Sequence, residues 1–213
     1  VVVQPDLGTA IMLVVSGLFV LFLAGIRWQH ALMMLAAATA VAPYLWFRLQ
    51  EYQRQRILTL FDPWADPLCS GYQAIQSQIA IGSAGISGKG WLAGSQSHLE
   101  FIPERSTDFI FAVFAEEFGL IGVLMLLLLY LFVVGRCLVM AYHTRGTFSR
   151  LLIGSLALTF FFYVFVNLGM VSGILPIVGV PLPLISYGGT SMLTLMAAFG
   201  IIMGLHARRR LMA

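Results

Sequence analysis

One stretch of this sequence, Gly119–Gly135, contains no charged residue and is almost wholly apolar. A helix needs about 20 apolar residues to cross the hydrocarbon core of a bilayer, and this stretch is long enough to cross most of it. Because backbone polar groups find no water in lipid, an open chain spans a membrane as helices. Together with four other apolar runs, the stretch predicts an all-α integral membrane protein with five membrane helices, at roughly 7–26, 30–47, 109–141, 151–172 and 190–206.

Composition excludes a soluble globular domain, because 60% of the residues are hydrophobic and 10% are charged. The arginines of the short links and of the tail fall on one side if the helices alternate, and short-loop arginines mark the cytoplasmic face. These arginines are Arg27, Arg136, Arg145, Arg150 and Arg208–Arg210. We therefore expect a single membrane domain, 1–213, with its N-terminus outside, its C-terminus in the cytoplasm and residues 48–107 as a large extracytoplasmic loop. The net charge of +3 gives no reason to expect a nucleic-acid partner.

The extracytoplasmic loop contains a helical pattern followed by a glycine-rich stretch. Apolar residues at 72, 75, 79 and 81 predict roughly one face of a short helix. The glycines at 82, 85, 88, 90 and 94 allow tight turns or a close approach of the backbone to a ligand. Neither a Walker loop nor a dinucleotide-binding fingerprint is matched. A flexible loop and a ligand-binding loop are therefore equal alternatives here.

Residues 174–189 are apolar but contain three prolines, so they cannot form a regular helix. Non-helical backbone within a membrane persists only where it is buried in protein or lines a cavity. The segment is therefore either a packed hairpin between two helices or a re-entrant wall of a substrate groove. We favour the groove, because Ser186, Tyr187 and Thr190 place hydroxyl groups in this apolar stretch.

Ionisable residues gather where the loop re-enters the membrane, and among them Asp108 is the candidate for catalysis. Ionisable groups near lipid are costly and usually functional. A simpler interpretation is that Ser106-Thr107-Asp108 caps the following helix, since hydroxyl and carboxylate groups suit a helix N-terminus. Two further acids, Glu116 and Glu117, lie about two turns into that helix, where a structural role is favoured.

The cations around this border suit an anionic, lipid-linked substrate. Arg54, Arg56 and Arg105 would bind phosphate through their guanidinium forks, and Lys89 as a point charge. The Asp108 carboxylate would accept a proton from a hydroxyl or hold a divalent metal against the phosphate. The histidines have no metal-ligand spacing, so no metal site is assigned to them. A lone Asn167 in an apolar helix is typical of contacts between helices.

Many motifs resemble the shape, elongation, division and sporulation (SEDS) family, in one order along the whole chain. They are Gln4-Pro-Asp-Leu-Gly-Thr9, Tyr52-Gln-Arg-Gln-Arg56, Asp66-Pro-Leu-Cys-Ser-Gly-Tyr-Gln-Ala-Ile-Gln-Ser77, Ile79-Ala-Ile-Gly82, Gly88-Lys-Gly90, Pro103-Glu-Arg-Ser-Thr-Asp-Phe-Ile-Phe111, Ala115-Glu-Glu117 and Pro183-Leu-Ile-Ser-Tyr-Gly-Gly189. Gly-Lys-Gly-Trp and Pro-Glu-Arg resemble the rod-shape-determining branch, whereas Ser106 stands where relatives usually carry His. The resemblance implies a ten-helix fold, of which this chain would be the C-terminal part.

The resemblance also implies a reaction, that of an inverting peptidoglycan glycosyltransferase in the bacterial cytoplasmic membrane. Such an enzyme polymerises lipid II, a disaccharide-pentapeptide on undecaprenyl pyrophosphate, during cell-wall elongation and cell-shape maintenance. Asp108 matches the essential aspartate of the family. The expected substrate-binding residues are Lys89, Arg54, Arg56, Arg105, Glu104, Ser186 and Tyr187. The expected partners are lipid II, a class B penicillin-binding protein transpeptidase and elongation-complex membrane proteins.

Two other functions stay open, a lipid II flippase and a non-catalytic membrane scaffold of the elongation machinery. A flippase needs polar residues along a full transmembrane path. Here the polar residues concentrate at the outer border, which favours chemistry at that border. The cofactor is undetermined, with a divalent cation, Mg²⁺ or Mn²⁺, as the candidate.

The predicted topology can be tested by cysteine labelling in intact cells. We expect a cysteine introduced by Ser70→Cys to react with a membrane-impermeant reagent, because residues 48–107 face outward. A cysteine introduced by Gly146→Cys should be protected on the cytoplasmic side. Labelling at 146 from outside, or protection at 70, would show that the topology is wrong.

Overall fold

The structure of the protein is a computed structural model that describes residues 7–48, 51–62, 71–94 and 106–211. Within these ranges the regular structure is entirely helical, as the apolar runs predict. Five of the described helices match the five expected apolar segments, and two more lie in the segment 48–107. Their bounds are α1 Leu7–Leu23, α2 Trp28–Arg48, α3 Glu51–Phe61, α4 Tyr72–Ser83, α6 Ile110–His143, α7 Thr147–Val171 and α8 Gly189–Leu211.

Three of the described helices are long and apolar enough to cross a membrane. They are α6, α7 and the Gly189–Ala207 part of α8, while Gly8–Leu23 of α1 is apolar but shorter. The α2 helix contains Pro43, whose ring disturbs a helix interior. The predicted all-α membrane fold is confirmed, and the count of five spanning helices stays a prediction.

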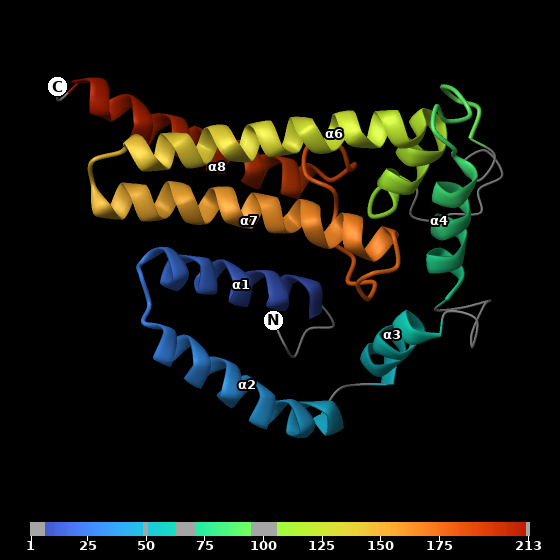
Figure 1. The fold of residues 1–213 in the computed structure, drawn as a ribbon, viewed down its shortest axis with the longest axis horizontal. Helices are drawn as coiled ribbons and strands as arrows, with labels where there is room; N and C mark the ends of the chain where they lie inside the picture. Colours follow the sequence, from blue (N-terminus) through green and yellow to red (C-terminus); the bar gives the residue numbers. More distant parts are fainter. Residues whose placement is uncertain (1–6, 49–50, 63–70, 95–105, 212–213) are drawn as a thin grey trace.

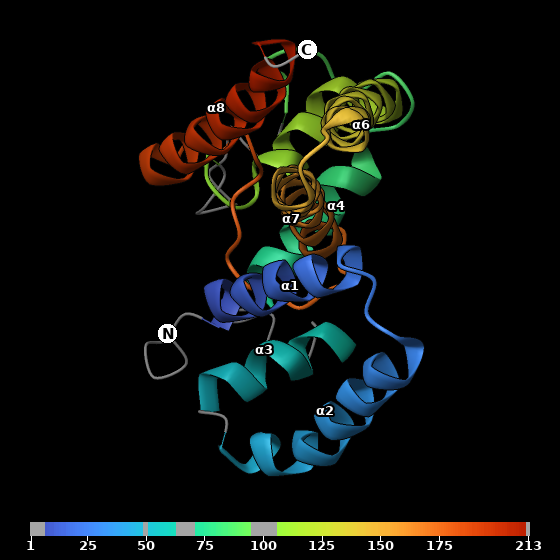
Figure 2. The ribbon, with the colours of Figure 1, turned by 90° about the vertical axis from the view of Figure 1, so that its left-hand side faces the viewer.

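The α7 helix lies at the centre of the bundle, where it packs against α1, α6 and α8 (Figure 1). Viewed along the bundle, α8 lies to one side of α6 and α7, and α1 lies beneath α7 (Figure 2). The links 24–27 and 144–146 and the C-terminal end of α8 share one end of the long axis, and α3 and α4 lie toward the other. The links that carry Arg27 and Arg145 therefore lie at the same end, as an alternating topology requires.

A buried apolar cluster joins the start of α6, the end of α7 and the proline-containing segment 172–188. Phe109, Met170 and Leu182, one from each of these parts, are at most 1% exposed. The irregular backbone of 172–188 is thus packed against protein on one side, as a membrane environment demands.

The expectation of one continuous helix over 109–141 is wrong, because α6 is broken at Gly119. Its φ of 65° and ψ of −163° lie in a region that is essentially restricted to glycine. The break leaves a helical segment, 110–118, set at an angle to the rest of α6 (Figure 1). We call the break at Gly119 the elbow. Because of it, Glu116 does not lie two turns deeper along a straight membrane helix.

The segment 48–107 also contains more regular structure than a loop. The α4 helix is confirmed, but of the apolar positions 72, 75, 79 and 81 one, Ile75, is buried. The other buried residues of α4 are Ala74, Ser77 and Ala80. Ile79 is 43% exposed, and the Ser77 hydroxyl donates to the Val171 carbonyl at 3.0 Å. Small and hydroxyl residues therefore let α4 approach the end of α7, a contact that apolar periodicity does not reveal.

Substitution of Gly119 tests the elbow. A Cβ atom at this position would lie 2.2 Å from the Gly88 nitrogen, and alanine would also have to adopt the strained φ. We expect Gly119→Ala to cost about 2 kcal/mol or more, measured by thermal unfolding in detergent.

Gly135→Ala is the matched control in the same helix. A Cβ at Gly135 meets nothing within 4 Å, so this change should be neutral or stabilising by up to about 1 kcal/mol. Equal melting temperatures for the two variants would contradict the elbow.

Candidate functional site

The segment 106–108, just before α6, is held through three consecutive backbone carbonyls. Each accepts a hydrogen bond from a residue that is distant in the sequence. The donors and acceptors are Tyr187 N–H to Ser106 O at 2.9 Å, Ser186 Oγ to Thr107 O at 2.6 Å and Asn167 Nδ2 to Asp108 O at 2.8 Å. The backbone that carries Asp108 is therefore fixed by α7 and by the proline-containing segment.

Asn167 is the link between these two elements. It is fully buried in α7, and its Nδ2 donates both to Asp108 O and, at 2.7 Å, to Val180 O. Two carbonyl acceptors require the amide nitrogen on this side, so the orientation of the side chain is determined. Its Oδ1 has no hydrogen-bond partner among the described residues. The predicted contact between helices is thus a contact to the site itself.

Side chains also hold the proline-containing segment in one conformation. The Ser186 hydroxyl accepts a hydrogen bond from Leu182 N–H at 2.7 Å, and the Tyr130 hydroxyl donates to Pro183 O at 2.6 Å. Leu184 adopts a φ of 67°, which costs a residue with a side chain roughly 1–2 kcal/mol. Such a conformation persists where the surroundings over-determine it.

The Asp108 side chain is partly exposed and lies beside Gly179. A Cβ atom on Gly179 would come within 3.3 Å of Asp108 Oδ2, and the φ of Gly179 is +69°. The N-cap residue of α6 is Phe109, so Asp108 lies one residue before the cap. The capping role of Ser106-Thr107-Asp108 stays an alternative to the catalytic one.

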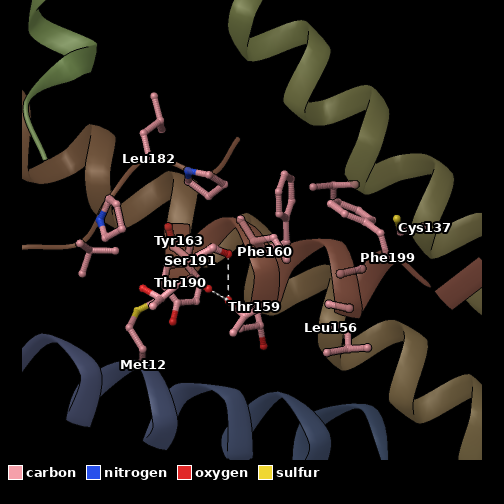
Figure 3. A pocket seen from close by; sticks show the side chains of 18 of the residues that line it. Met12, Cys137, Leu156, Thr159, Phe160, Tyr163, Leu182, Thr190, Ser191 and Phe199 are labelled. Atoms are coloured by element: carbon pink, nitrogen blue, oxygen red, sulfur yellow. Dashed lines mark hydrogen bonds between the residues drawn. The ribbon is translucent and has the colours of Figure 1, made fainter. Parts of the chain in front are cut away.

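A cavity of about 500 Å³ lies between α1, α6, α7 and α8 (Figure 3). Met12, Phe160 and Phe199 give it apolar walls, and the hydroxyl residues Thr190 and Ser191 lie on one side. Residues 179–183 of the proline-containing segment line it as well. Gly179 therefore borders both the Asp108 carboxylate and the cavity, and the segment is packed on one side and lines a cavity on the other.

Among the predicted cations, Lys89 forms an ion pair with a carboxylate of the protein. Its Nζ is 2.6 Å from Glu116 Oε1, and Glu116 is fully buried. This ion pair agrees with the structural role expected for Glu116. A contact of Lys89 with pyrophosphate stays a prediction.

The two predicted arginines of α3 donate to backbone carbonyls. Arg54 Nη2 lies 3.0 Å from Phe47 O, and Arg56 Nη1 lies 3.3 Å from Ile177 O. Arg56 thus reaches the proline-containing segment that also holds 106–108. Residues 104 and 105, which were expected to contact substrate, lie outside the described residues.

Ser186 and Tyr187, the predicted hydroxyl contacts, differ in how the structure uses them. The Ser186 hydroxyl is engaged with the backbone as both donor and acceptor. The Tyr187 side chain is 82% exposed, and its N–H binds the Ser106 carbonyl. For both residues a contact with substrate stays a prediction.

Ser186→Ala tests whether the Ser186 hydroxyl fixes the backbone of residues 106–108. The change leaves Leu182 N–H and Thr107 O without this partner, and an unsatisfied polar group costs about 1–3 kcal/mol. We expect a lower melting temperature in detergent. Tyr187→Phe is the control, because it keeps the N–H donor and alters an exposed side chain. An unchanged melting temperature for Ser186→Ala would show that the hydroxyl does not hold the segment.

Curated relatives of the chain are longer than the chain itself. It is 56% identical to the peptidoglycan glycosyltransferase MrdB of Escherichia coli (strain K12) over 214 residues, which cover 100% of this chain and 58% of that protein. It is 43% identical to the peptidoglycan glycosyltransferase RodA of Treponema pallidum (strain Nichols) over 161 residues, which cover 76% of this chain and 37% of that protein. The chain thus spans less than two thirds of the length of these relatives.

Two solved structures share the fold. One comes from a peptidoglycan synthase complex and is described by the structural coordination of polymerization and crosslinking. It matches with a TM-score of 0.82 and 36% identity over 98% of this chain and 57% of that one. The other is a crystal structure of an aspartate-to-alanine mutant of the Thermus thermophilus rod shape determining protein RodA. It matches with a TM-score of 0.62 and 30% identity over 97% of this chain and 51% of that one.

The family can be assigned from a match over almost the whole length. The model of the cell cycle protein family of FtsW, RodA and SpoVE matches residues 1–211. This match confirms the resemblance that the SEDS motifs indicate. The chain belongs to the FtsW/RodA/SpoVE family of cell cycle proteins.

Proposed function

We propose that the protein is a peptidoglycan glycosyltransferase that polymerises lipid II into glycan strands during cell-wall elongation. The observation that carries the proposal is the setting of Asp108. Its backbone is fixed by Asn167, and its carboxylate lies against Gly179, which also lines an apolar cavity. The 56% identity to a protein named for this activity supports it.

In the proposed reaction, the 4-hydroxyl of the acceptor attacks the anomeric carbon of the donor sugar. The bond from that carbon to the pyrophosphate oxygen breaks with inversion, and undecaprenyl pyrophosphate leaves with the electron pair. Asp108 accepts the hydroxyl proton as general base. A single displacement of this kind needs one base and a stabiliser of the leaving-group charge, so one carboxylate with several cations is sufficient.

The arginines are the proposed stabilisers of the leaving group. A guanidinium group is permanently charged and binds phosphate oxygens in a bidentate way. Arg56 has the strongest structural support, because it reaches Ile177 in the segment that holds the neighbouring Ser106 and Thr107 carbonyls. We propose Arg54 and Arg105 as further phosphate contacts, and Glu104, Ser186 and Tyr187 as contacts to other parts of the substrate.

An alternative role for Asp108 is to hold a Mg²⁺ or Mn²⁺ ion against the pyrophosphate. Across the parts of the chain that the structure describes, no group of three or more His, Cys, Asp or Glu side chains is placed to hold a metal. Mg²⁺, however, is often bound by one or two carboxylates together with substrate phosphates and water. Asp108 fits this mode, in which a bound ion would neutralise charge on the leaving group.

The protein is a multi-pass membrane protein, as its apolar helices and its family indicate. We place it in the bacterial cytoplasmic membrane, with the start of this chain outside and its end in the cytoplasm. The arginine-bearing links at one end of the bundle support this orientation. Asp108 would then act at the outer surface.

We propose a class B penicillin-binding protein transpeptidase as the partner, within a larger set of elongation-complex membrane proteins. One solved structure with this fold is described as a peptidoglycan synthase complex that coordinates polymerization and crosslinking. Crosslinking of glycan strands is a transpeptidase reaction, so it requires a catalytic domain of another kind.

Asp108→Asn in the full-length protein tests the catalytic assignment. The substitution removes the charge but keeps the size of the side chain and the backbone carbonyl that Asn167 binds. We expect polymerisation of labelled lipid II to fall about 10²–10⁴-fold, the usual contribution of a general base, at an unchanged melting temperature.

Asp62→Asn, at the end of α3, removes the same charge elsewhere and should keep the activity. A near wild-type rate for Asp108→Asn would end the catalytic assignment. Recovery of that variant by added divalent cation would favour the role as metal ligand. Transfer of lipid II across the membrane by the wild type without glycan formation would favour the flippase.

A further inference from the structure

We propose that the loop 85–91 is a clamp that positions Asp108, and that Lys89 acts through Glu116 as a positioning residue rather than as a ligand of pyrophosphate. The inference rests on the proposed function, because it connects the clamp to the reaction at Asp108. The loop contains the Gly88-Lys-Gly-Trp91 motif, and each residue of that motif meets the helical segment 110–118 or the elbow at Gly119.

The backbone of the clamp inserts into the hydrogen bonding of α6. In a continuous helix, Leu120 N–H would bind the Glu116 carbonyl and Ile121 N–H the Glu117 carbonyl. Here residues of the clamp bind all four of these N–H and carbonyl groups. The bonds are Lys89 N–H to Glu116 O at 3.0 Å, Gly90 N–H to Glu117 O at 3.0 Å, Leu120 N–H to Gly85 O at 3.1 Å and Ile121 N–H to Ile86 O at 3.1 Å. The clamp therefore satisfies the helix ends that the elbow creates.

The two glycines at the contact leave no space for side chains. A Cβ on Gly88 would lie 2.1 Å from the Glu117 carbonyl oxygen, and one on Gly119 would lie 2.2 Å from the Gly88 nitrogen. Both residues also have positive φ, 74° and 65°. Trp91 adds an aromatic contact to Phe118, with ring centroids 5.7 Å apart. Backbone thus packs directly on backbone at the elbow.

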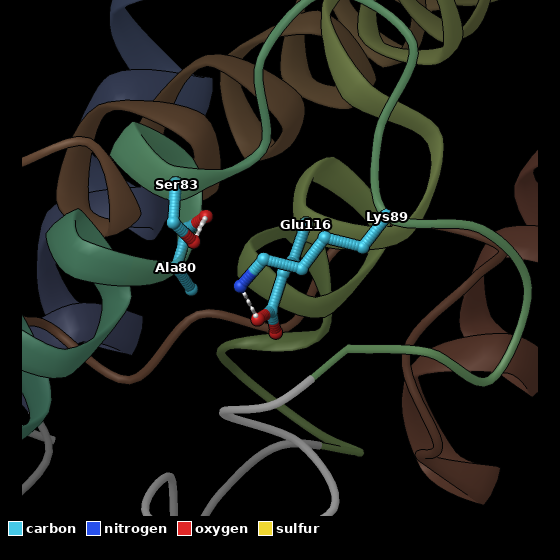
Figure 4. A network of polar contacts seen from close by, with 4 residues as sticks. All are labelled: Ala80, Ser83, Lys89 and Glu116. Carbon is cyan, nitrogen blue, oxygen red and sulfur yellow. Dashed lines mark hydrogen bonds and ion pairs between the residues drawn. The ribbon is translucent and has the colours of Figure 1, made fainter.

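The Lys89–Glu116 ion pair fastens the clamp to the short helix (Figure 4). Glu116 is 0% exposed, whereas the Lys89 side chain is 28% exposed. Removal of one partner from a buried pair is strongly destabilising, because the other charge stays buried without compensation. A phosphate group would have to compete with a carboxylate that already lies 2.6 Å from the ammonium group.

The clamp and the site are the two ends of one rigid element. Helix 110–118 is held at its start by Asn167 and Ser186, through the backbone of 106–108, and at its end by the clamp. A rotation of this helix at the elbow would therefore move Asp108 relative to Gly179. Misplacement of a catalytic group by about 1 Å can lower turnover about 100-fold.

The test uses four forms of the full-length protein: wild type, Lys89→Met, Glu116→Gln and the double variant. Each is measured for melting temperature and for kcat and KM in lipid II polymerisation. Lys89→Met should lower the melting temperature and reduce kcat about 100-fold, with a smaller effect on KM. The double variant has no buried charge, so it should regain the melting temperature and most of kcat.

Two results would overturn the proposal. One is a double variant that regains its melting temperature but keeps the low activity of Lys89→Met with a raised KM, which would make Lys89 a substrate contact. The other is purely additive losses of stability, which would show that the two side chains are not coupled. If Lys89→Met does not fold, Glu116→Gln alone decides, because the clamp predicts a lower kcat and a phosphate contact predicts none.

Failure of the proposed function gives a different pattern. A wild-type protein that does not polymerise lipid II refutes the glycosyltransferase. The coupling of melting temperatures between Lys89 and Glu116 would still report whether the clamp exists.

Discussion

Backbone that is not helical at the end of an apolar bundle must find its hydrogen-bond partners inside the protein, and this demand shapes the end of the molecule that carries Asp108. The demand arises at the segment 106–108, at the proline-containing segment and at the elbow. Each is met by groups that are distant in the sequence, such as the Asn167 amide, the Ser186 hydroxyl and the clamp N–H groups. Several polar groups of this region therefore form hydrogen bonds with non-helical backbone.

This use of polar residues changes how a functional site at a membrane border is interpreted. Ionisable and hydroxyl residues near lipid are commonly functional. Here the Ser186 hydroxyl and the Glu116 carboxylate bind groups of the protein, and the Asp108 carboxylate lies beside Gly179, which lines a cavity. The catalytic assignment thus depends on where a polar group points, which its presence in an apolar stretch does not reveal.

The sequence predicts the helices well because apolar length is a local property. It does not predict the elbow, since Gly119, Gly122 and Gly135 all lie in the same apolar run and one of them has a positive φ. The difference lies in the loop 85–91, which fits against Gly119 from about 30 positions earlier in the chain. Asp108 could be singled out as an acid at a membrane border. The roles of Asn167 and Lys89 required knowledge of contacts across the fold.

The elbow also explains how Asp108 comes to face α7. A straight extension of α6 from Leu120 back to Asp108 would add about 18 Å at 1.5 Å per residue. In the structure the segment turns at Gly119 instead, and the Asp108 carbonyl reaches Asn167, which lies one turn before the end of α7 at Val171. At the elbow the clamp supplies four backbone hydrogen bonds to residues 116, 117, 120 and 121. The contact between Asp108 and Asn167 therefore depends on the clamp, although this contact and the clamp lie at opposite ends of the short helix 110–118.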